Sequence, residues 1–141
     1  MMTVRKMLLP LALLGFSGDA MAQGWSADWK VIGVAEDRTE VLVRPESVQE
    51  LPPSAERHFT VRQVWAGFDH TTAYGIEAGR KIILFQYDCA SRRMLIAAAT
   101  DYTADGKVIA RHAVPNDRAD LYEAVEPETL GETIMATACP A

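Results

Sequence analysis

Short alternating runs of apolar and polar residues recur along the chain and predict β-strands. The runs are separated by turn residues and cover residues 29–35, 40–44, 57–66, 81–89, 93–102 and 107–113. In the third run Val61 and Trp65 fall on one face and Arg62 on the other. Asp105-Gly106 predicts a hairpin turn between the last two runs, because glycine adopts the positive φ that such turns require.

The segments between these runs predict connections. Residues 46–55 contain Pro52-Pro53, and the segment after the third run contains Gly67, Gly75 and Gly79, so both predict irregular loops. Residues 116–122 are rich in turn formers, and their pattern leaves the segment unassigned. The strand runs and these loops together predict a small antiparallel sheet of about six strands.

The last segment predicts a helix that packs on this sheet. Thr129 and Glu132 have the spacing of a capping box. An apolar stripe follows at Leu130, Ile134 and Ala138. Gly131 in the first turn argues against the helix, because glycine costs about 1 kcal/mol relative to alanine. The fold class expected is therefore α+β, a small antiparallel β-sheet packed by a C-terminal helix.

The N-terminal residues have the pattern of a secretory signal. Arg5 and Lys6 precede an apolar stretch at 7–16, and Ala20-Met21-Ala22 forms a small-x-small cleavage site. A membrane anchor needs about 20 apolar residues, and this stretch is shorter. No cysteine lies near the site for lipid attachment. We expect a cleaved signal peptide at 1–22 and one domain at 23–141 that is periplasmic, secreted or on the cell surface, and not a lipoprotein.

The two cysteines, Cys89 and Cys139, predict a disulfide, because exported proteins meet an oxidising environment. The bond would close a loop of about 50 residues, which stabilises a fold by roughly 4 kcal/mol in the chain-entropy model. Two free thiols, one of them catalytic, are the alternative. That alternative has little support, because the chain has no Cys-x-x-Cys pair and no histidine beside either cysteine.

The disulfide also predicts which face of the sheet the helix covers. Cys89 shares its face with Ile83, Phe85 and Tyr87, because strand residues alternate. A bond to Cys139 places the helix over this face, so these residues are expected to form a core with Leu130 and Ile134. Ile82 and Leu84 lie on the opposite face. Either a curled sheet or a loop covers them, or a second subunit does, which would make a homodimer.

Charge and length exclude several classes of protein. The chain has 141 residues and a net charge of −5, with no basic stripe beyond Arg92-Arg93, so nucleic acid is not an expected partner. After residue 22, no segment is long and apolar enough to span a membrane. Hydrophobic residues make up 49% of the chain, which is typical of one globular domain.

No pattern of catalytic, metal-binding or cofactor-binding residues is visible. His58, His70 and His112 share no short ligand spacing, and Asp69-His70 alone is a weak sign of acid/base chemistry. The serines lie outside any Gly-x-Ser-x-Gly motif, and glycine-rich phosphate loops are absent. The acidic residues of the C-terminal part predict a solvated face rather than a calcium loop. They are Asp117, Asp120, Glu123, Glu126 and Glu128. We expect a protein that is not an enzyme and holds no metal or cofactor.

Several short motifs match the pattern of a known bacterial family over residues 25–140. They are Tyr-Asp-Cys-Ala-Ser-Arg-Arg at 87–93, Tyr102, Gly106, Pro127-x-Thr129-x-x-Glu132, Ala138-Cys139, Trp29 and Pro45-Glu46-Ser47-Val48. Together these residues resemble the surface-adhesin protein E-like family. The resemblance implies an antiparallel sheet, a C-terminal helix and the cysteine bridge. It also implies a dimer-forming surface protein that binds host extracellular-matrix and serum proteins such as vitronectin and laminin.

These observations support two functional hypotheses. The first is an exported, non-enzymatic binding module that recognises a host matrix or envelope protein through the exposed sheet face and loops. Its candidate contacts are Arg62, Trp65, Arg92 and Arg93. The second is a structural or regulatory periplasmic protein with an envelope partner and no host ligand. Arg92 and Arg93 have two alternative roles. They contact an anionic group of a partner, or they form a salt bridge with Asp88 inside the turn.

Overall fold

The structure is a computed structural model that describes residues 28–70, 79–115 and 118–140. The expected signal peptide lies outside these residues. Within these residues, eight strands form one antiparallel sheet. They are β1 (Lys30–Val34), β2 (Glu40–Val43), β3 (Gln49–Leu51), β4 (Val61–His70), β5 (Gly79–Asp88), β6 (Arg93–Thr103), β7 (Val108–Ala113) and β8 (Glu123–Ala124). The helical elements are η1 (Pro45–Ser47), η2 (Ala119–Leu121) and α2 (Leu130–Ala138). The α+β architecture with a C-terminal helix is as the sequence predicts.

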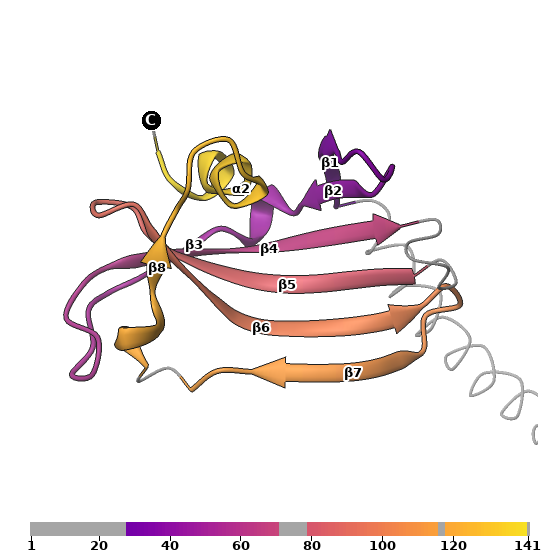
Figure 1. Ribbon diagram of the computed structural model, residues 1–141. Helices are drawn as coiled ribbons and strands as arrows, with labels where there is room; N and C mark the ends of the chain where they lie inside the picture. Colours follow the sequence, from indigo (N-terminus) through magenta and orange to yellow (C-terminus); the bar gives the residue numbers. More distant parts are fainter. Residues whose placement is uncertain (1–27, 71–78, 116–117, 141) are drawn as a thin grey trace, which may run out of the picture.

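The sheet is centred on the long pair β4 and β5. The strand order is β1-β2-β4-β5-β6-β7, with β3 also paired to β4 and β8 also paired to β6. Thus β2 and β3 follow each other along one edge of β4. In the same way β7 and β8 share one edge of β6. Figure 1 shows α2 beside β4 and the β1–β2 pair, away from β7 at the opposite edge of the sheet.

Two predicted loops are partly wrong, because strand pairing extends into them. Gly67 lies within β4 opposite Ile82, and Gly79 begins β5 opposite His70. Glycine has low strand propensity, but pairing with a neighbouring strand overrides that preference. The short strands β3 and β8 are the other difference, since the sequence predicts about six strands and no element at either place. Each pairs with three residues or fewer of a long neighbour, so neither leaves a periodic signal.

The helix α2 begins where the capping pattern predicts. The Thr129 side chain accepts a hydrogen bond from the backbone N–H of Glu132 at 3.3 Å. The Glu132 carboxylate in turn accepts from the backbone N–H of Glu128 at 3.1 Å. Packing explains the glycine at position 131, because a Cβ there would lie 2.8 Å from the Met94 sulfur. The close approach of α2 to β6 therefore favours glycine in this first turn.

The main core lies between α2 and one face of the sheet. Its buried residues are Val41, Val43, Val64, Ala66, Ile83, Phe85, Tyr87, Val125, Ile134, Met135 and Ala138. The expected core is confirmed for Ile83, Phe85, Tyr87 and Ile134. It is wrong for Leu130, which is 42% exposed. Leu130 is the first residue of α2, and the stripe that faces the sheet consists of Ile134, Met135 and Ala138.

A smaller core lies on the opposite face at one end of the sheet. Val61, Leu95 and Tyr122 are buried there, and Phe59 packs on them with its ring edge-to-face at 5.1 Å from that of Tyr122. The residues around η2 therefore cover this end, which is the loop cover expected as one alternative. Trp65, Ile82 and Leu84 lie on the same face and are only half-buried. We call these three residues the open face.

Candidate functional site

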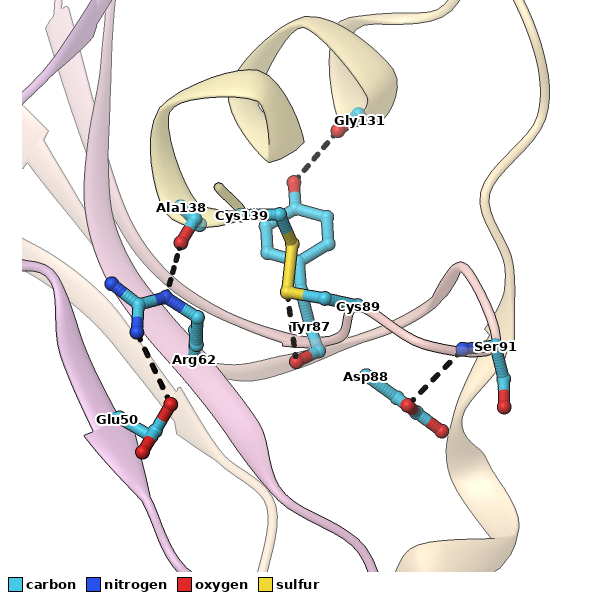
Figure 2. The surroundings of a disulfide bond; sticks show 9 residues. All are labelled: Glu50, Arg62, Tyr87, Asp88, Cys89, Ser91, Gly131, Ala138 and Cys139. Atoms are coloured by element: carbon cyan, nitrogen blue, oxygen red, sulfur yellow. Dashed lines mark hydrogen bonds and ion pairs between the residues drawn. A yellow bond between two sulfur atoms is a disulfide. The ribbon is translucent and has the colours of Figure 1, made fainter. Parts of the chain in front are cut away.

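The disulfide between Cys89 and Cys139 joins the end of β5 to the end of α2, as predicted. The Cα atoms are 5.8 Å apart, and no cysteine is free. Figure 2 shows two further links around this bond. The Tyr87 hydroxyl donates to the Gly131 carbonyl at 2.8 Å, and Arg62 Nε donates to the Ala138 carbonyl at 2.7 Å. One covalent and two polar links therefore fix α2 on the sheet.

Arg62 is engaged within the fold. Besides Ala138, its guanidinium contacts the Glu50 carboxylate of β3 at 3.3 Å (Figure 2). Its side chain is half-buried among β3, β4 and α2. This placement makes Arg62 a connection between three elements, on the α2 face of the sheet.

Arg92 and Arg93 are adjacent in sequence but contact different parts of the fold. Arg92 adopts a left-handed φ of 52° in the turn between β5 and β6, and its guanidinium lies 2.6 Å from the Glu132 carboxylate of α2. Arg93 pairs with Asp88 at 2.8 Å and stacks over the Phe59 ring at 4.8 Å. The salt bridge with Asp88, considered above for both arginines, therefore forms with Arg93. Arg92 pairs instead with Glu132 of α2.

A shallow pocket of about 390 Å³ lies beside Arg92. The disulfide sulfurs, the Arg92–Glu132 pair and Met135 are among its lining groups. Among its lining residues, Arg92 and Glu132 form one ion pair.

Trp65 lies on the open face, away from the other three predicted contacts. It pairs across the sheet with Leu84, and Ile82 lies two residues before Leu84 in β5. Because strand residues alternate, Arg62 three positions earlier points to the α2 face. The structure thus does not gather the four predicted contacts into one patch: Arg62 and Arg92 lie near α2, Arg93 near Phe59 and Trp65 on the open face.

The histidines do not come together. His58 precedes β4 and His70 ends it, at opposite ends of a ten-residue strand, and His112 is exposed on β7. The structure does not describe the side chain of His70. Asp69 contacts Arg80 at 3.3 Å. Within the described ranges, no group of three or more histidine, cysteine or acidic residues could hold a metal ion.

The acidic residues near the C-terminal end are spread over the surface. Asp120, Glu123, Glu126 and Glu128 are exposed, and Asp117 lies outside the described residues. A hydrogen bond from Arg118 lowers the pKa of Asp120 below its ordinary value. This arrangement is that of a solvated acidic face.

A chain of polar side chains on the face opposite α2, buried at Tyr122 and Gln86 and reaching solvent at Gln49, was missed by the sequence analysis. The Tyr122 hydroxyl donates to Gln86 at 2.8 Å, Gln86 donates to Gln63 at 3.3 Å, and Gln63 donates to Gln49 at 3.3 Å. Burial raises the pKa of Tyr122, so its hydroxyl remains a donor to a higher pH than that of an exposed tyrosine. No local motif marks such a chain, because its members come from four separate elements.

Arg57 is a second buried polar residue that the strand pattern missed. The sequence predicts a strand from residue 57, but β4 begins at Val61. The Arg57 guanidinium instead donates to the carbonyls of Phe59 at 2.9 Å and Pro52 at 2.6 Å. These bonds satisfy backbone carbonyls of the loop before β4, so Arg57 has a structural role.

The comparisons agree with the fold. A family model described as surface-adhesin protein E matches residues 29–140, which include the whole sheet, α2 and both cysteines. No curated protein and no solved structure matches the chain significantly. In the described part of the chain, no helix has the length and apolarity to cross a membrane. The family and the disulfide indicate an exported cell-surface protein with a non-enzymatic, protein-binding role. The chain belongs to the surface-adhesin protein E family.

Proposed function

We propose that this protein is an exported binding module of the bacterial envelope, which recognises a host extracellular-matrix protein or another envelope protein. It reaches the periplasm or the cell surface through a signal peptide cleaved after Ala22, and it carries no lipid anchor. Its contact surface is the open face of the sheet. The disulfide, which forms in oxidising compartments, fits this location.

The half-buried apolar residues of the open face are the observation that carries this proposal. The helix covers the other face, and the small core around Tyr122 covers only one end of this one. Trp65, Ile82 and Leu84 therefore keep part of their surface in contact with solvent. Apolar and aromatic side chains grouped on a sheet, with tryptophan among them, are typical of the centre of a protein interface.

The links around α2 support the same role. The disulfide, Tyr87 and Arg62 fix the helix and the sheet relative to each other. A surface held in one conformation loses little conformational entropy when a partner binds, so more of its contact energy is realised as affinity.

Among the predicted contacts, we assign the central role to Trp65. Arg92 keeps 55% of its side chain exposed beside the pocket and serves as a peripheral contact with an anionic group. Arg62 and Arg93 contribute mainly through the fold, because Arg62 donates to the Ala138 carbonyl and pairs with Glu50, and Arg93 pairs with the buried Asp88. A second copy of the chain is the competing occupant of the open face.

Direct binding tests this function. The exported protein, purified from its cells, is passed over immobilised vitronectin, immobilised laminin and an immobilised envelope extract at physiological salt. We expect a protein partner in at least one arm, and at least tenfold weaker binding by Trp65→Ala. Leu130→Ala is the matched control, because Leu130 is 42% exposed but lies on α2. Equal loss in both variants, or no bound protein in any arm, would contradict the proposal.

A gene deletion distinguishes the second candidate, a structural or regulatory envelope protein without a host ligand. An envelope-stress defect with unchanged adherence would favour this second candidate. Reduced adherence without envelope stress would favour the host-binding module.

A further inference from the structure

Four strands of the described sheet pair on one side only. They are β1, β3, β7 and β8. The strands β3 and β8 have three and two residues. The strand β1 has five residues, but a bulge between Val31 and Gly33 interrupts its register. With six residues, β7 is the longest of these outer strands. Its free edge is therefore the longest in the described part of the sheet.

The hydrogen-bond pattern shows which backbone groups of β7 point outward. Val114 N–H donates to Ala97 O at 2.9 Å, and the register continues through Ala99–His112 and Asp101–Ala110. In an antiparallel ladder, alternate residues bond to the neighbour and the others face away. Hence Ala110 and His112 bond to β6, whereas the N–H and C=O groups of Arg111 and Ala113 point away from the sheet.

The side chains of β7 also remain accessible. Ile109 is 65% exposed and Val108 is 45% exposed. Ile109 is the extra residue of a bulge, because Asp101 pairs with Ala110 and Tyr102 with Val108. The regular stretch that follows, residues 110–114, has no proline and is long enough to pair with a short extended segment.

The charge of this edge is opposite to that of the chain as a whole. Between residues 107 and 114 the basic residues are Lys107, Arg111 and His112, and no acidic residue occurs, although the chain carries a net charge of −5. Lys107 lies 3.9 Å from the Asp105 carboxylate, so the positive charge that a partner could use is that of Arg111. Within the described ranges, Arg111 has no ion pair. Two copies of β7 paired with each other would bring their arginines close together, which disfavours a second copy here.

We propose that β7 binds an extended acidic segment of the partner protein by adding it to the sheet as a further strand. The backbone groups of Arg111 and Ala113 supply the hydrogen bonds, and Arg111 contacts a carboxylate of the segment. Ile109 contacts its apolar side chains. This inference rests on the proposed function and names the binding mode and the kind of segment that is recognised.

Synthetic peptides test the binding mode. One eight-residue peptide alternates valine with glutamate, and the control alternates valine with lysine. Amide exchange is followed by NMR in the exported protein. We expect the glutamate peptide to slow exchange at Arg111 and Ala113 at least tenfold, with little change at Ala110 and His112, which already bond to β6. We expect the lysine peptide to bind at least tenfold more weakly.

Two substitutions separate strand addition from binding elsewhere. Ala113→Pro removes an N–H that points away from the sheet, and it leaves the hydrogen bonds to β6 in place. The glutamate peptide should therefore bind this variant at least tenfold more weakly. Ala113→Val keeps the N–H, so its affinity for the glutamate peptide should be within twofold of that of the parent protein. If the proline variant does not fold, Arg111→Glu replaces it and should reverse the preference between the two peptides.

Three results would overturn the inference. These are equal binding of the glutamate peptide by Ala113→Pro and Ala113→Val, equal binding of the two peptides, and concentration-dependent protection of Arg111 and Ala113 by a second copy. The inference can fail while the proposed function holds. Capture of vitronectin, laminin or an envelope protein that depends on Trp65 but not on Ala113→Pro would retain the open face and reject the β7 edge.

Discussion

The Tyr87 hydroxyl on β5 donates a 2.8 Å hydrogen bond to the Gly131 carbonyl in the first turn of α2, 44 residues later in the chain. At the other end of α2, Cys139 is bonded to Cys89, and Arg62 donates to Ala138. Both ends of the helix are thus fixed to the sheet. Because Tyr87 is fully buried, its hydroxyl has few other partners available.

Tyr87→Phe is expected to destabilise the protein by about 1 kcal/mol, because it removes the hydroxyl donor but keeps the buried ring. Urea unfolding measures the change. Tyr102→Phe is the matched control, since Tyr102 is only half-buried on β6, and it should have a smaller effect. An equal loss in both variants would show that the bond to Gly131 adds no stability.

The protein should lose stability above pH 10, and Tyr87 should contribute to that loss. Burial raises the pKa of Tyr87 above its ordinary value of 10.0. Above pH 10 the unfolded chain releases this proton while the folded protein keeps it, so the free energy of unfolding falls as pH rises. One such group gives a slope of up to about 1.4 kcal/mol per pH unit. Unfolding experiments between pH 9 and 11 should show a shallower slope in Tyr87→Phe.

Gly131→Ala should have a different effect depending on Met94. A Cβ at Gly131 lies 2.8 Å from the Met94 sulfur, so Met94 must move to make room. In the parent protein this displacement offsets the gain in helix propensity of about 1 kcal/mol, and stability should change little. With Met94→Ala in place, the same substitution should stabilise by about 1 kcal/mol. A double-mutant cycle by urea unfolding tests this coupling, and equal effects in both backgrounds would refute it.

Removing the disulfide should cost about 4 kcal/mol, because Cys89 and Cys139 close a loop with a sequence separation of 50. Cys89→Ser with Cys139→Ser should therefore unfold at much lower urea concentration. A thiol reductant should destabilise the parent protein by a similar amount and leave the double variant unchanged. If the reductant has no effect on the parent protein, the bond does not contribute to the stability measured.

Much of the fold could be predicted from local signals. Alternation places the long strands, Gly106 has the positive φ of 91° expected of its turn, and Thr129 caps α2 as its spacing predicts. The disulfide and the face under the helix follow from two cysteines and strand alternation. These features depend on residues close together in sequence or on a single covalent link.

The features that the sequence did not predict depend on contacts between segments far apart in the chain. Gly67 and Gly79 lie in strands only because β4 and β5 pair along their full lengths. Arg62 reaches Ala138, 76 residues later, and no pattern around either residue indicates that bond. For the same reason the open face and the free edge of β7 could not be located before the strand order was known. Which surfaces stay exposed is a property of the assembled sheet.

The neighbouring arginines Arg92 and Arg93 should differ in their effect on stability. Arg93 pairs with Asp88, whose side chain is 4% exposed, whereas Arg92 pairs with Glu132, which is 37% exposed. Arg93→Ala leaves a buried carboxylate without its partner and should cost about 3 kcal/mol. Arg92→Ala breaks a pair in contact with water and should cost less than about 1 kcal/mol.

Urea unfolding of both variants, with Asp88→Asn as a third, distinguishes the charge of Asp88 from the packing of Arg93. If the unpaired carboxylate is the cause, adding Asp88→Asn to Arg93→Ala should recover part of the lost stability, because the amide that replaces the carboxylate carries no charge. If the loss instead comes from the contact between Arg93 and the Phe59 ring, the second substitution should recover nothing. An equal cost for the two arginines would mean that water solvates Asp88 as well as it solvates Glu132.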